Sequence, residues 1–302
     1  MARIYDKAYF DGKIVPLSDA NVSIASSAVL YGLSVYTVFP VCKGENGLLG
    51  FRLKEHAQRL TNSARIIGMD AVVTEEELRD AAQVLITENS VNEDVFVRVS
   101  LHVTDLVPGV RSRGLKTTLS IFIYEAACIL PKDGARLKTS VWRRIPDYAI
   151  PSRAKVNGAY VNSVLARQDA LDSGYDDCIF LDVSGHVCEL SAANIFLVRD
   201  GVLHTPSQAN DILEGISRKT IIQIAQDMGI EVRERTIDLT ELYVADEVFA
   251  CGTSAFLTPV KEIDKRVVAN GEIGELTKKL QSAYFNVLHG KEEKYVSFLT
   301  AL

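Results

Sequence analysis

Apolar residues recur along this chain with two spacings, one typical of helices and one of strands. Residues 53–67 carry apolar side chains at intervals of three and four, which predicts an amphipathic helix. Thr74 and Glu77 have the spacing of a capping box and predict the start of a second helix. Residues 95–103 alternate instead, with valine or leucine on one face, which predicts a strand. Its other face carries Phe96, Arg98, Ser100 and His102.

Turn residues divide the remaining apolar segments into hairpins. Asp11-Gly12 predicts a hairpin near the N-terminus, and residues 43–47 predict the turn of a second one. Ser184-Gly185 and Asp200-Gly201 predict an antiparallel meander. Further helices are predicted over residues 161–173, 216–228, 238–243 and 276–288, and further strands over residues 117–124, 137–144, 231–235 and 247–250.

The segment 125–136 interrupts this pattern with Pro131 and Asp133-Gly134, so we expect it to connect two domains. A smaller domain would span residues 1–124, and a larger domain, carrying Lys155, would span residues 137–302.

Composition excludes several classes of protein. The 302 residues are 47% hydrophobic and carry a net charge of −6, with no basic cluster, which argues against a nucleic-acid partner. There is no apolar stretch of membrane-spanning length, and the first residues lack the apolar run of a signal peptide. The five scattered cysteines lack CxxC spacing and are expected to be buried thiols in a reducing cytoplasm. The five histidines lack ligand spacing, so no metal site is expected.

Lys155 is the first candidate for chemistry. It stands between the extended segment around Pro151 and a turn of small residues, with Tyr160 five positions on. A lysine amine becomes a nucleophile when burial or a neighbouring cation lowers its pKa, and it can then form a Schiff base. Pyridoxal phosphate is the usual aldehyde, and its site needs a carboxylate, a phosphate site and a donor to the ring oxygen. The alternative is an ordinary surface lysine.

Four other segments supply candidate partners, each with a structural alternative. Leu213–Arg218 precedes a helix and could bind an anion or simply cap the helix. Glu189 ends a strand and could pair with a ring nitrogen or lie on the surface. The turn Cys251–Ala255 offers a hydroxyl and backbone donors. Arg98 could bind a carboxylate or lie on the solvated face of an edge strand.

Taken together, these segments resemble a known family. The chain is similar to the class IV aminotransferases, which have pyridoxal-phosphate fold type IV (the D-amino acid aminotransferase-like fold), and most of all to branched-chain amino acid aminotransferases. The resemblance covers residues 9–285. It rests on these motifs: Glu55-His56-x-x-Arg59-Leu60, Lys155, Glu189-x-Ser-x-x-Asn194-Ile-Phe, Leu213-x-Gly-Ile-Ser-Arg218, Asp246-Glu247-Val-Phe and Gly252-Thr253.

The resemblance implies a role for each matching residue. Lys155 would form the Schiff base and move the substrate proton, Glu189 would pair with the pyridinium nitrogen, and Tyr160 would donate to the ring oxygen. The implied cofactor site also includes Arg59, Asn194, Leu213, Gly215, Ile216, Ser217, Gly252 and Thr253. The implied substrate pocket includes Tyr31, Tyr36, Phe96, Arg98, Thr253, Ser254 and Ala255.

The implied activity is transfer of the amino group of leucine, isoleucine or valine to 2-oxoglutarate by a ping-pong mechanism. The implied fold is α/β (α+β) with two domains and the cofactor between them, and the implied assembly is a homodimer or a larger oligomer. Three segments depart from the family's usual pattern and affect substrate choice: Val35–Val38, Thr104–Arg113 and Cys128–Pro131. Alternatives in the same fold are a D-amino acid transaminase, an (R)-amine transaminase and an aminodeoxychorismate lyase. From a different class, a non-catalytic pyridoxal-phosphate-binding protein stays open.

Overall fold

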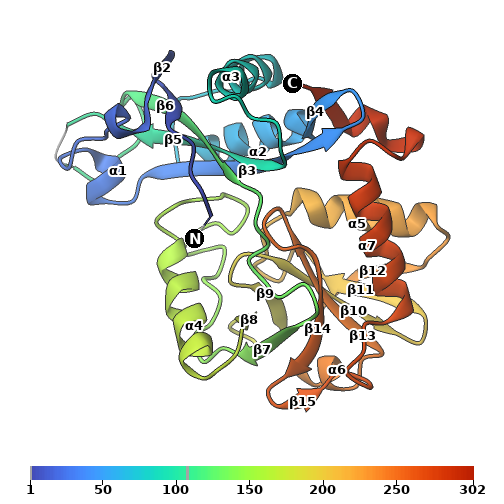
Figure 1. Ribbon diagram of the computed structural model, residues 1–302. Helices are drawn as coiled ribbons and strands as arrows, with labels where there is room; N and C mark the ends of the chain where they lie inside the picture. The colour runs from blue at the N-terminus through green and yellow to red at the C-terminus, as the bar shows by residue number, and fades with distance from the viewer. Residues whose placement is uncertain (1, 107–108) are drawn as a thin grey trace. The chain divides into compact units, whose positions relative to one another are not determined.

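The computed structural model describes residues 2–106 and 109–302, which form two compact units (Figure 1). The first unit contains the residues up to Ala127, together with Ala154–Ala159 and Asn286–Leu302. The second unit contains Cys128–Arg153 and Tyr160–Phe285. By packing, therefore, the segment that carries Lys155 and the C-terminal residues group with the first unit. The predicted domain division at residues 125–136 stays a prediction.

An antiparallel sheet forms the first unit. Its strands lie in the order β16-β4-β3-β5-β6-β1-β2. Their bounds are β1 (Lys7–Phe10), β2 (Lys13–Pro16), β3 (Ser34–Gly44), β4 (Gly47–Phe51), β5 (Val95–Val103), β6 (Thr117–Glu125) and β16 (Leu299–Ala301). Both predicted N-terminal hairpins are confirmed, since β1 pairs with β2 and β3 pairs with β4. In the first hairpin, Asp11 and Gly12 have the positive φ values, 49° and 85°, that a tight two-residue turn requires.

Helices α2 (Leu53–Ile66) and α3 (Glu75–Glu88) pack on this sheet (Figure 1). The apolar stripe of α2 is buried as predicted. The capping box at Thr74 is confirmed, because its side chain and that of Glu77 each accept a backbone N–H. Shorter helical segments are α1 (Ser27–Leu30), η1 (Leu17–Asp19) and η2 (Glu293–Phe298).

Strand β5 lies inside the sheet, between β3 and β6. The alternative of an edge strand with a solvated polar face is therefore wrong. Phe96 and Ser100 on the polar face are buried, and Arg98 is half-buried. Alternation alone could not distinguish an edge from a centre, because both faces of this strand are covered.

The second unit contains a nine-stranded sheet in the order β12-β11-β10-β13-β14-β7-β8-β9, with β15 paired to β14. The bounds are β7 (Ala135–Thr139), β8 (Asp177–Leu181), β9 (Val187–Leu190), β10 (Asn194–Arg199), β11 (Val202–Pro206), β12 (Val232–Arg235), β13 (Glu247–Gly252), β14 (Phe256–Ile263) and β15 (Arg266–Val267). An additional pairing of β9 with β10 closes part of the sheet on itself, with Glu189 opposite Asn194.

The helices of the second unit begin and end close to their predicted bounds. They are α4 (Tyr160–Asp172), α5 (Ile216–Asp227), α6 (Leu239–Tyr243) and α7 (Glu275–Leu288). The strand predicted over residues 137–144 is wrong in extent. The ladder of β7 ends at Thr139, and the Ser140 hydroxyl then accepts the N–H of Trp142, a local bond that competes with sheet pairing.

Two further expectations concern the lengths of the helices and the burial of the cysteines. Within residues 2–106 and 109–302, the helices are all too short or too polar to cross a membrane. The five cysteines are free thiols, of which Cys42, Cys178, Cys188 and Cys251 are buried. The predicted burial of cysteines in apolar strands is thus confirmed for these four.

Candidate active site

The Lys155 segment adds to β3 in the first unit. Val156 bridges Val35, the Tyr36 N–H donates to the Lys155 carbonyl at 3.0 Å, and the Lys155 N–H donates to the Ser63 hydroxyl of α2 at 3.1 Å. Gly32, at φ +66°, allows this approach, because a Cβ there would come within 2.9 Å of the Gly158 Cα. The backbone of Lys155 is therefore fixed by strand and helix, whereas its side chain is half-buried.

The ring of Tyr36 contacts two cations. The Lys155 amine lies 4.8 Å from the ring centroid and the Arg98 guanidinium 3.7 Å from it. Arg98 also donates to the Asn157 side-chain oxygen at 2.7 Å. The structure thus brings together three of the predicted functional residues, Lys155, Tyr36 and Arg98. It adds Asn157, which the motifs did not indicate.

Arg59 lies on α2 and donates to the Thr37 hydroxyl at 2.8 Å. The same hydroxyl lies 2.7 Å from Nδ1 of His56. His56 is 1% exposed, and burial, with the nearby cations as further causes, holds its pKa well below the usual range. His56 is therefore neutral, and this network fixes the Arg59 side chain without adding charge. Thr37 belongs to one of the segments that depart from the family pattern.

Glu189 of the second unit is buried, so the alternative of a surface glutamate is wrong. Its carboxylate accepts the Asn194 side-chain amide and the Leu213 N–H, both at 3.1 Å, and pairs with Arg144 at 3.0 Å. Asn194 also donates to the Leu213 carbonyl at 3.0 Å. Sequence reasoning missed Arg144, because it follows an irregular segment with no motif. Glu189 and Asn194, on neighbouring strands, thus form one network with Leu213 and Arg144, which lie much farther away along the chain.

Helix α5 begins in the same network. Its N-cap is Gly215, and no side chain caps its first turn. The first turn contains Ile216 and Ser217, and the Ser217 hydroxyl accepts a bond from Tyr284 at 3.0 Å. The Arg218 side chain is buried and donates to the Pro206 carbonyl and the Glu234 carboxylate, which ties α5 to β11 and β12. The helix start therefore offers backbone N–H groups suited to an anion.

The remaining predicted residues occupy several environments. Thr253 follows β13, and the carbonyls of Ser254 and Ala255 accept the Ile129 N–H and the Thr258 hydroxyl. Tyr160 begins α4, and Tyr31 is 41% exposed just after α1. Phe96 is fully buried against the ring of Tyr124. In the predicted substrate segment Thr104–Arg113, Val107 and Pro108 lie outside the described residues.

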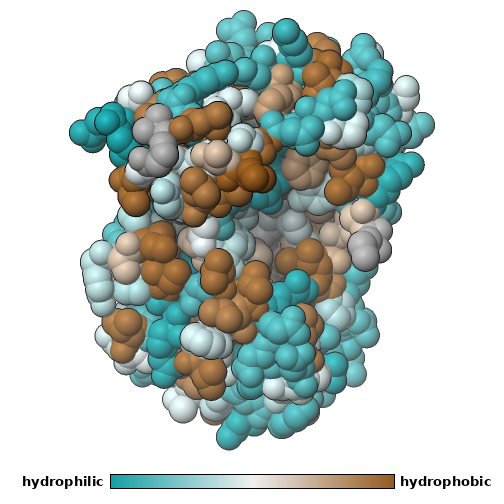
Figure 2. Space-filling view, turned by 90° about the vertical axis from the view of Figure 1, so that its left-hand side faces the viewer, coloured by the Kyte–Doolittle hydropathy of each residue, from teal (hydrophilic) through white to brown (hydrophobic). Residues whose placement is uncertain are grey.

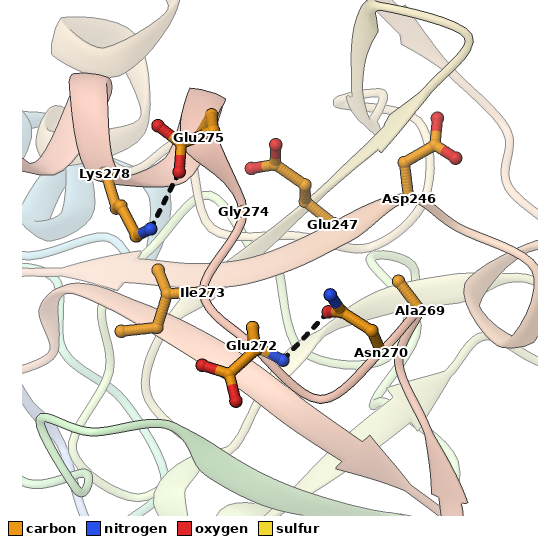
Figure 3. A pocket seen from close by; sticks show the side chains of 9 residues that line it. All are labelled: Asp246, Glu247, Ala269, Asn270, Glu272, Ile273, Gly274, Glu275 and Lys278. Atoms are coloured by element: carbon orange, nitrogen blue, oxygen red, sulfur yellow. Dashed lines mark hydrogen bonds and ion pairs between the residues drawn. The ribbon is translucent and has the colours of Figure 1, made fainter.

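A pocket of about 520 Å³ in the second unit contains none of the predicted site residues (Figure 3). Its lining includes Asp246 and Glu247 from the quoted motif. Glu247 accepts the N–H groups of Leu276 and Thr277 at 3.0 and 2.7 Å, so it caps α7. Asp246 accepts the Asp200 N–H at 2.8 Å. Both motif carboxylates therefore have structural roles.

The fold also gathers Cys42, Asp94 and His289, whose potential ligand atoms lie within 4.8 Å of one another. Spacing along the sequence could not reveal this group. His289 contacts one Asp94 oxygen at 3.1 Å, and the Lys43 N–H donates to the other at 2.8 Å. Burial, and then Asp94, raise the pKa of the Cys42 thiol, which favours the neutral form over the thiolate that a metal binds. The geometry supports an anchor for the C-terminal segment.

Comparison with known proteins identifies the family. Residues 34–263 match the family model described as amino-transferase class IV. The chain belongs to the class IV aminotransferases. It is 41% identical over 299 residues to a probable branched-chain-amino-acid aminotransferase of Aquifex aeolicus (strain VF5), covering 98% of this chain and 96% of the relative. It is 36% identical to the branched-chain-amino-acid aminotransferase of Escherichia coli (strain K12), covering 95% and 94%.

Solved structures agree with this membership. The branched-chain aminotransferase of Thermoproteus uzoniensis, crystallised with norvaline, has a TM-score of 0.94 and 38% identity, covering 98% of this chain and 99% of that one. The branched-chain amino acid aminotransferase of Thermobaculum terrenum, in its PLP form, has a TM-score of 0.91 and 32% identity, covering 98% of each chain. The predicted fold type IV is confirmed, and the protein is a pyridoxal-phosphate-dependent transaminase.

The residues in each unit fit this cofactor. The uncapped start of α5, with the Ser217 hydroxyl, suits a phosphate, and the buried Glu189 carboxylate suits a protonated ring nitrogen. In the first unit, Lys155 supplies an amine that contacts the Tyr36 ring, as the Arg98 guanidinium does, and Arg59 supplies a further cation. The second unit by itself therefore offers groups suited to a phosphate and a pyridinium, and the first unit by itself offers an amine suited to an aldehyde.

Proposed function

We propose that this transaminase transfers amino groups between branched-chain L-amino acids and 2-oxoglutarate. The observation that carries the proposal is the Tyr36 ring in contact with both the Lys155 amine and the Arg98 guanidinium. An amine suited to covalent chemistry and a guanidinium suited to a carboxylate thus contact the same aromatic ring. Near-full-length similarity to enzymes named for branched-chain amino acids supports the substrate class.

Each group of residues has its own task in this reaction. Pyridoxal phosphate, when bound, supplies the aldehyde and the electron-withdrawing ring. We propose that the Lys155 amine holds the cofactor covalently and moves the proton at the substrate Cα. Glu189 would keep a proton on the ring nitrogen, with its charge fixed by Arg144 and Asn194. The first turn of α5, Thr253 and Arg59 would bind the phosphate, and Tyr160 would donate to the ring oxygen.

A half-reaction screen tests the proposal. The cofactor-loaded protein is mixed with L-leucine, L-valine, L-glutamate, D-alanine or (R)-1-phenylethylamine, and loss of the visible cofactor absorbance is followed. We expect fast loss with the L-amino acids. Inert L-leucine with fast turnover of D-alanine or the amine would support the alternative transaminases, and no response to any donor would support a non-catalytic binding protein. Lys155→Ala is the negative control.

We also propose that the protein forms a homodimer or a larger homo-oligomer. Helix α4 presents apolar side chains to solvent: Val161 and Val164 are 65% and 63% exposed, and Leu165 and Leu171 are 41% and 43% exposed. Figure 2 shows hydrophobic residues gathered on the side where α4 lies in Figure 1. A stripe of this kind supports association, since contiguous exposed apolar patches mark interaction sites.

Sedimentation velocity tests this association. Val161→Glu combined with Val164→Glu should shift the protein to the monomer, because two charges would enter an apolar contact. Val72→Glu, at a residue that is 70% exposed, serves as the control and should sediment as the wild type. A wild-type monomer, or a double variant that still associates, would contradict the proposal.

We further propose that the protein functions in the cytoplasm. The five free thiols support a reducing compartment. Cell fractionation with a marker enzyme tests this expectation.

A further inference from the structure

Asn157 lies two residues after Lys155, and its side chain connects strands β3 and β5 of the first unit. Its oxygen accepts from Arg98 on β5 at 2.7 Å, and its amide nitrogen donates to the Ser34 hydroxyl on β3 at 2.6 Å. Its backbone N–H donates to the Ser34 carbonyl at 2.9 Å. The backbone bond fixes the residue, so the side-chain oxygen has a defined position beside the guanidinium.

Arg98 is held by neutral groups. One face of its guanidinium lies 3.7 Å from the Tyr36 ring centroid, and its Nη2 donates to an uncharged amide. Among the ion pairs of the described residues, none includes Arg98. Its positive charge is therefore oriented but not compensated by a protein carboxylate. A carboxylate on a ligand would therefore meet a guanidinium of fixed orientation whose positive charge is not compensated by the protein.

We propose that Asn157 is a positioning and specificity-determining residue, which orients Arg98 for the distal carboxylate of a dicarboxylic substrate while leaving its charge available. This inference rests on the proposed function and specifies how one site serves two substrate classes. For an apolar substrate, Arg98 stays against Tyr36 and Asn157. For a dicarboxylate, the same guanidinium provides the matching charge.

Asparagine is suited to this task because it accepts a bond without carrying charge. An aspartate at position 157 would keep the shape and the acceptor, and the Ser34 hydroxyl could reverse its role and donate. It would also form an ion pair with Arg98, so the substrate carboxylate would meet a neutral pair. The effect should appear only with a substrate that has a second carboxylate.

The test measures kcat and KM of the cofactor-loaded enzyme for 2-oxoglutarate and for 4-methyl-2-oxopentanoate. With Asn157→Asp, kcat/KM for 2-oxoglutarate should fall about tenfold or more, mainly through KM, because a charged partner now competes for Arg98. The value for 4-methyl-2-oxopentanoate should change by less than about twofold, because this substrate does not need the charge. Asn157→Ala should weaken 2-oxoglutarate less than Asn157→Asp does, since Arg98 loses its orientation but keeps its charge.

Asn46→Asp, on the exposed turn between β3 and β4, adds the same charge elsewhere and should leave both substrates unchanged. Bound cofactor and thermal unfolding are measured for every variant. Equal losses for both substrates, or no loss with Asn157→Asp, would overturn the role of Asn157. A wild-type enzyme that turns over neither substrate would instead overturn the proposed function. If Asn157→Asp does not fold, a twofold or larger selective rise in KM with Asn157→Ala supports the inference, and its absence refutes it.

Discussion

Gly215 permits the packing between the start of α5 and the Glu189 network, and Gly215→Ala tests that packing directly. A Cβ at position 215 would overlap the Asn194 side-chain oxygen and lie 3.3 Å from the Cβ of Arg218. The Asn194 side chain would have to move. It would lose its bonds to the Glu189 carboxylate at 3.1 Å and to the Leu213 carbonyl at 3.0 Å.

The structure gives the magnitude of this loss. A hydrogen bond to a charged group contributes about 1.5–3 kcal/mol, and a neutral one about 1 kcal/mol. Gly215→Ala should therefore lower the free energy of unfolding by about 2.5–4 kcal/mol and weaken cofactor retention, because Glu189 loses a donor. Urea unfolding of the cofactor-free protein and dialysis of the loaded protein measure the two effects.

A double-mutant cycle isolates the cause. In an Asn194→Ala background the overlapping oxygen is absent, so Gly215→Ala should cost less than about 1 kcal/mol there. The coupling between the two substitutions should be about 2 kcal/mol. Additive losses would refute the reasoning, since they would show that the alanine acts through something other than Asn194.

Three further predictions follow from the network geometry. Thr37→Val should lower the free energy of unfolding by about 2 kcal/mol, because Arg59 and the buried His56 both lose their partner, and chemical denaturation measures this; an unchanged midpoint would contradict it. The pKa of His56 is held below its usual 6.5, so below about pH 6.5 the unfolded chain binds a proton that the folded chain does not bind. The free energy of unfolding therefore falls as the pH drops below about 6.5, by about 1.4 kcal/mol per pH unit. His56→Asn should flatten this slope in melting curves between about pH 5 and pH 7, and an identical slope would exclude His56 as its source. Arg235 lowers the pKa of Glu241 from 4.5 to about 2, so this ion pair stabilises the fold above that range and is lost as the pH falls through it; Glu241→Gln should reduce the difference in melting temperature between neutral and acidic pH, and an equal difference would argue against the pair.

Much of the fold follows from local patterns. The helix of residues 53–66, the capping box at Thr74 and the hairpin at Asp11-Gly12 could be predicted because spacing, caps and turn residues act within a few positions. Strand position could not be predicted in this way. Strand β5 was ambiguous between edge and centre, and β7 ends at Thr139, before the end of the strand predicted over residues 137–144, because neighbouring strands and local side-chain bonds decide both.

The candidate site shows the same division. Motifs indicated Lys155, Glu189 and the start of α5, because each stands in a recognisable local segment. Their partners stand outside the motifs: Arg144 binds Glu189, and Ser63 holds the Lys155 backbone. Asn157, two residues after Lys155, binds Arg98 of β5, a contact that only folding makes. The cofactor and substrate roles of the motif residues stay predictions for the experiments above.

The sequence by itself therefore determined the class of chemistry. A lysine, a carboxylate and a helix start suited to an anion can each be recognised from a short local segment. Only the tertiary structure decided the charge around them. It made His56 neutral by burial, compensated Glu189 with Arg144, and held Arg98 with an uncharged amide. The physical reason is that burial and charge pairing depend on groups brought together by folding, which distance along the chain does not record.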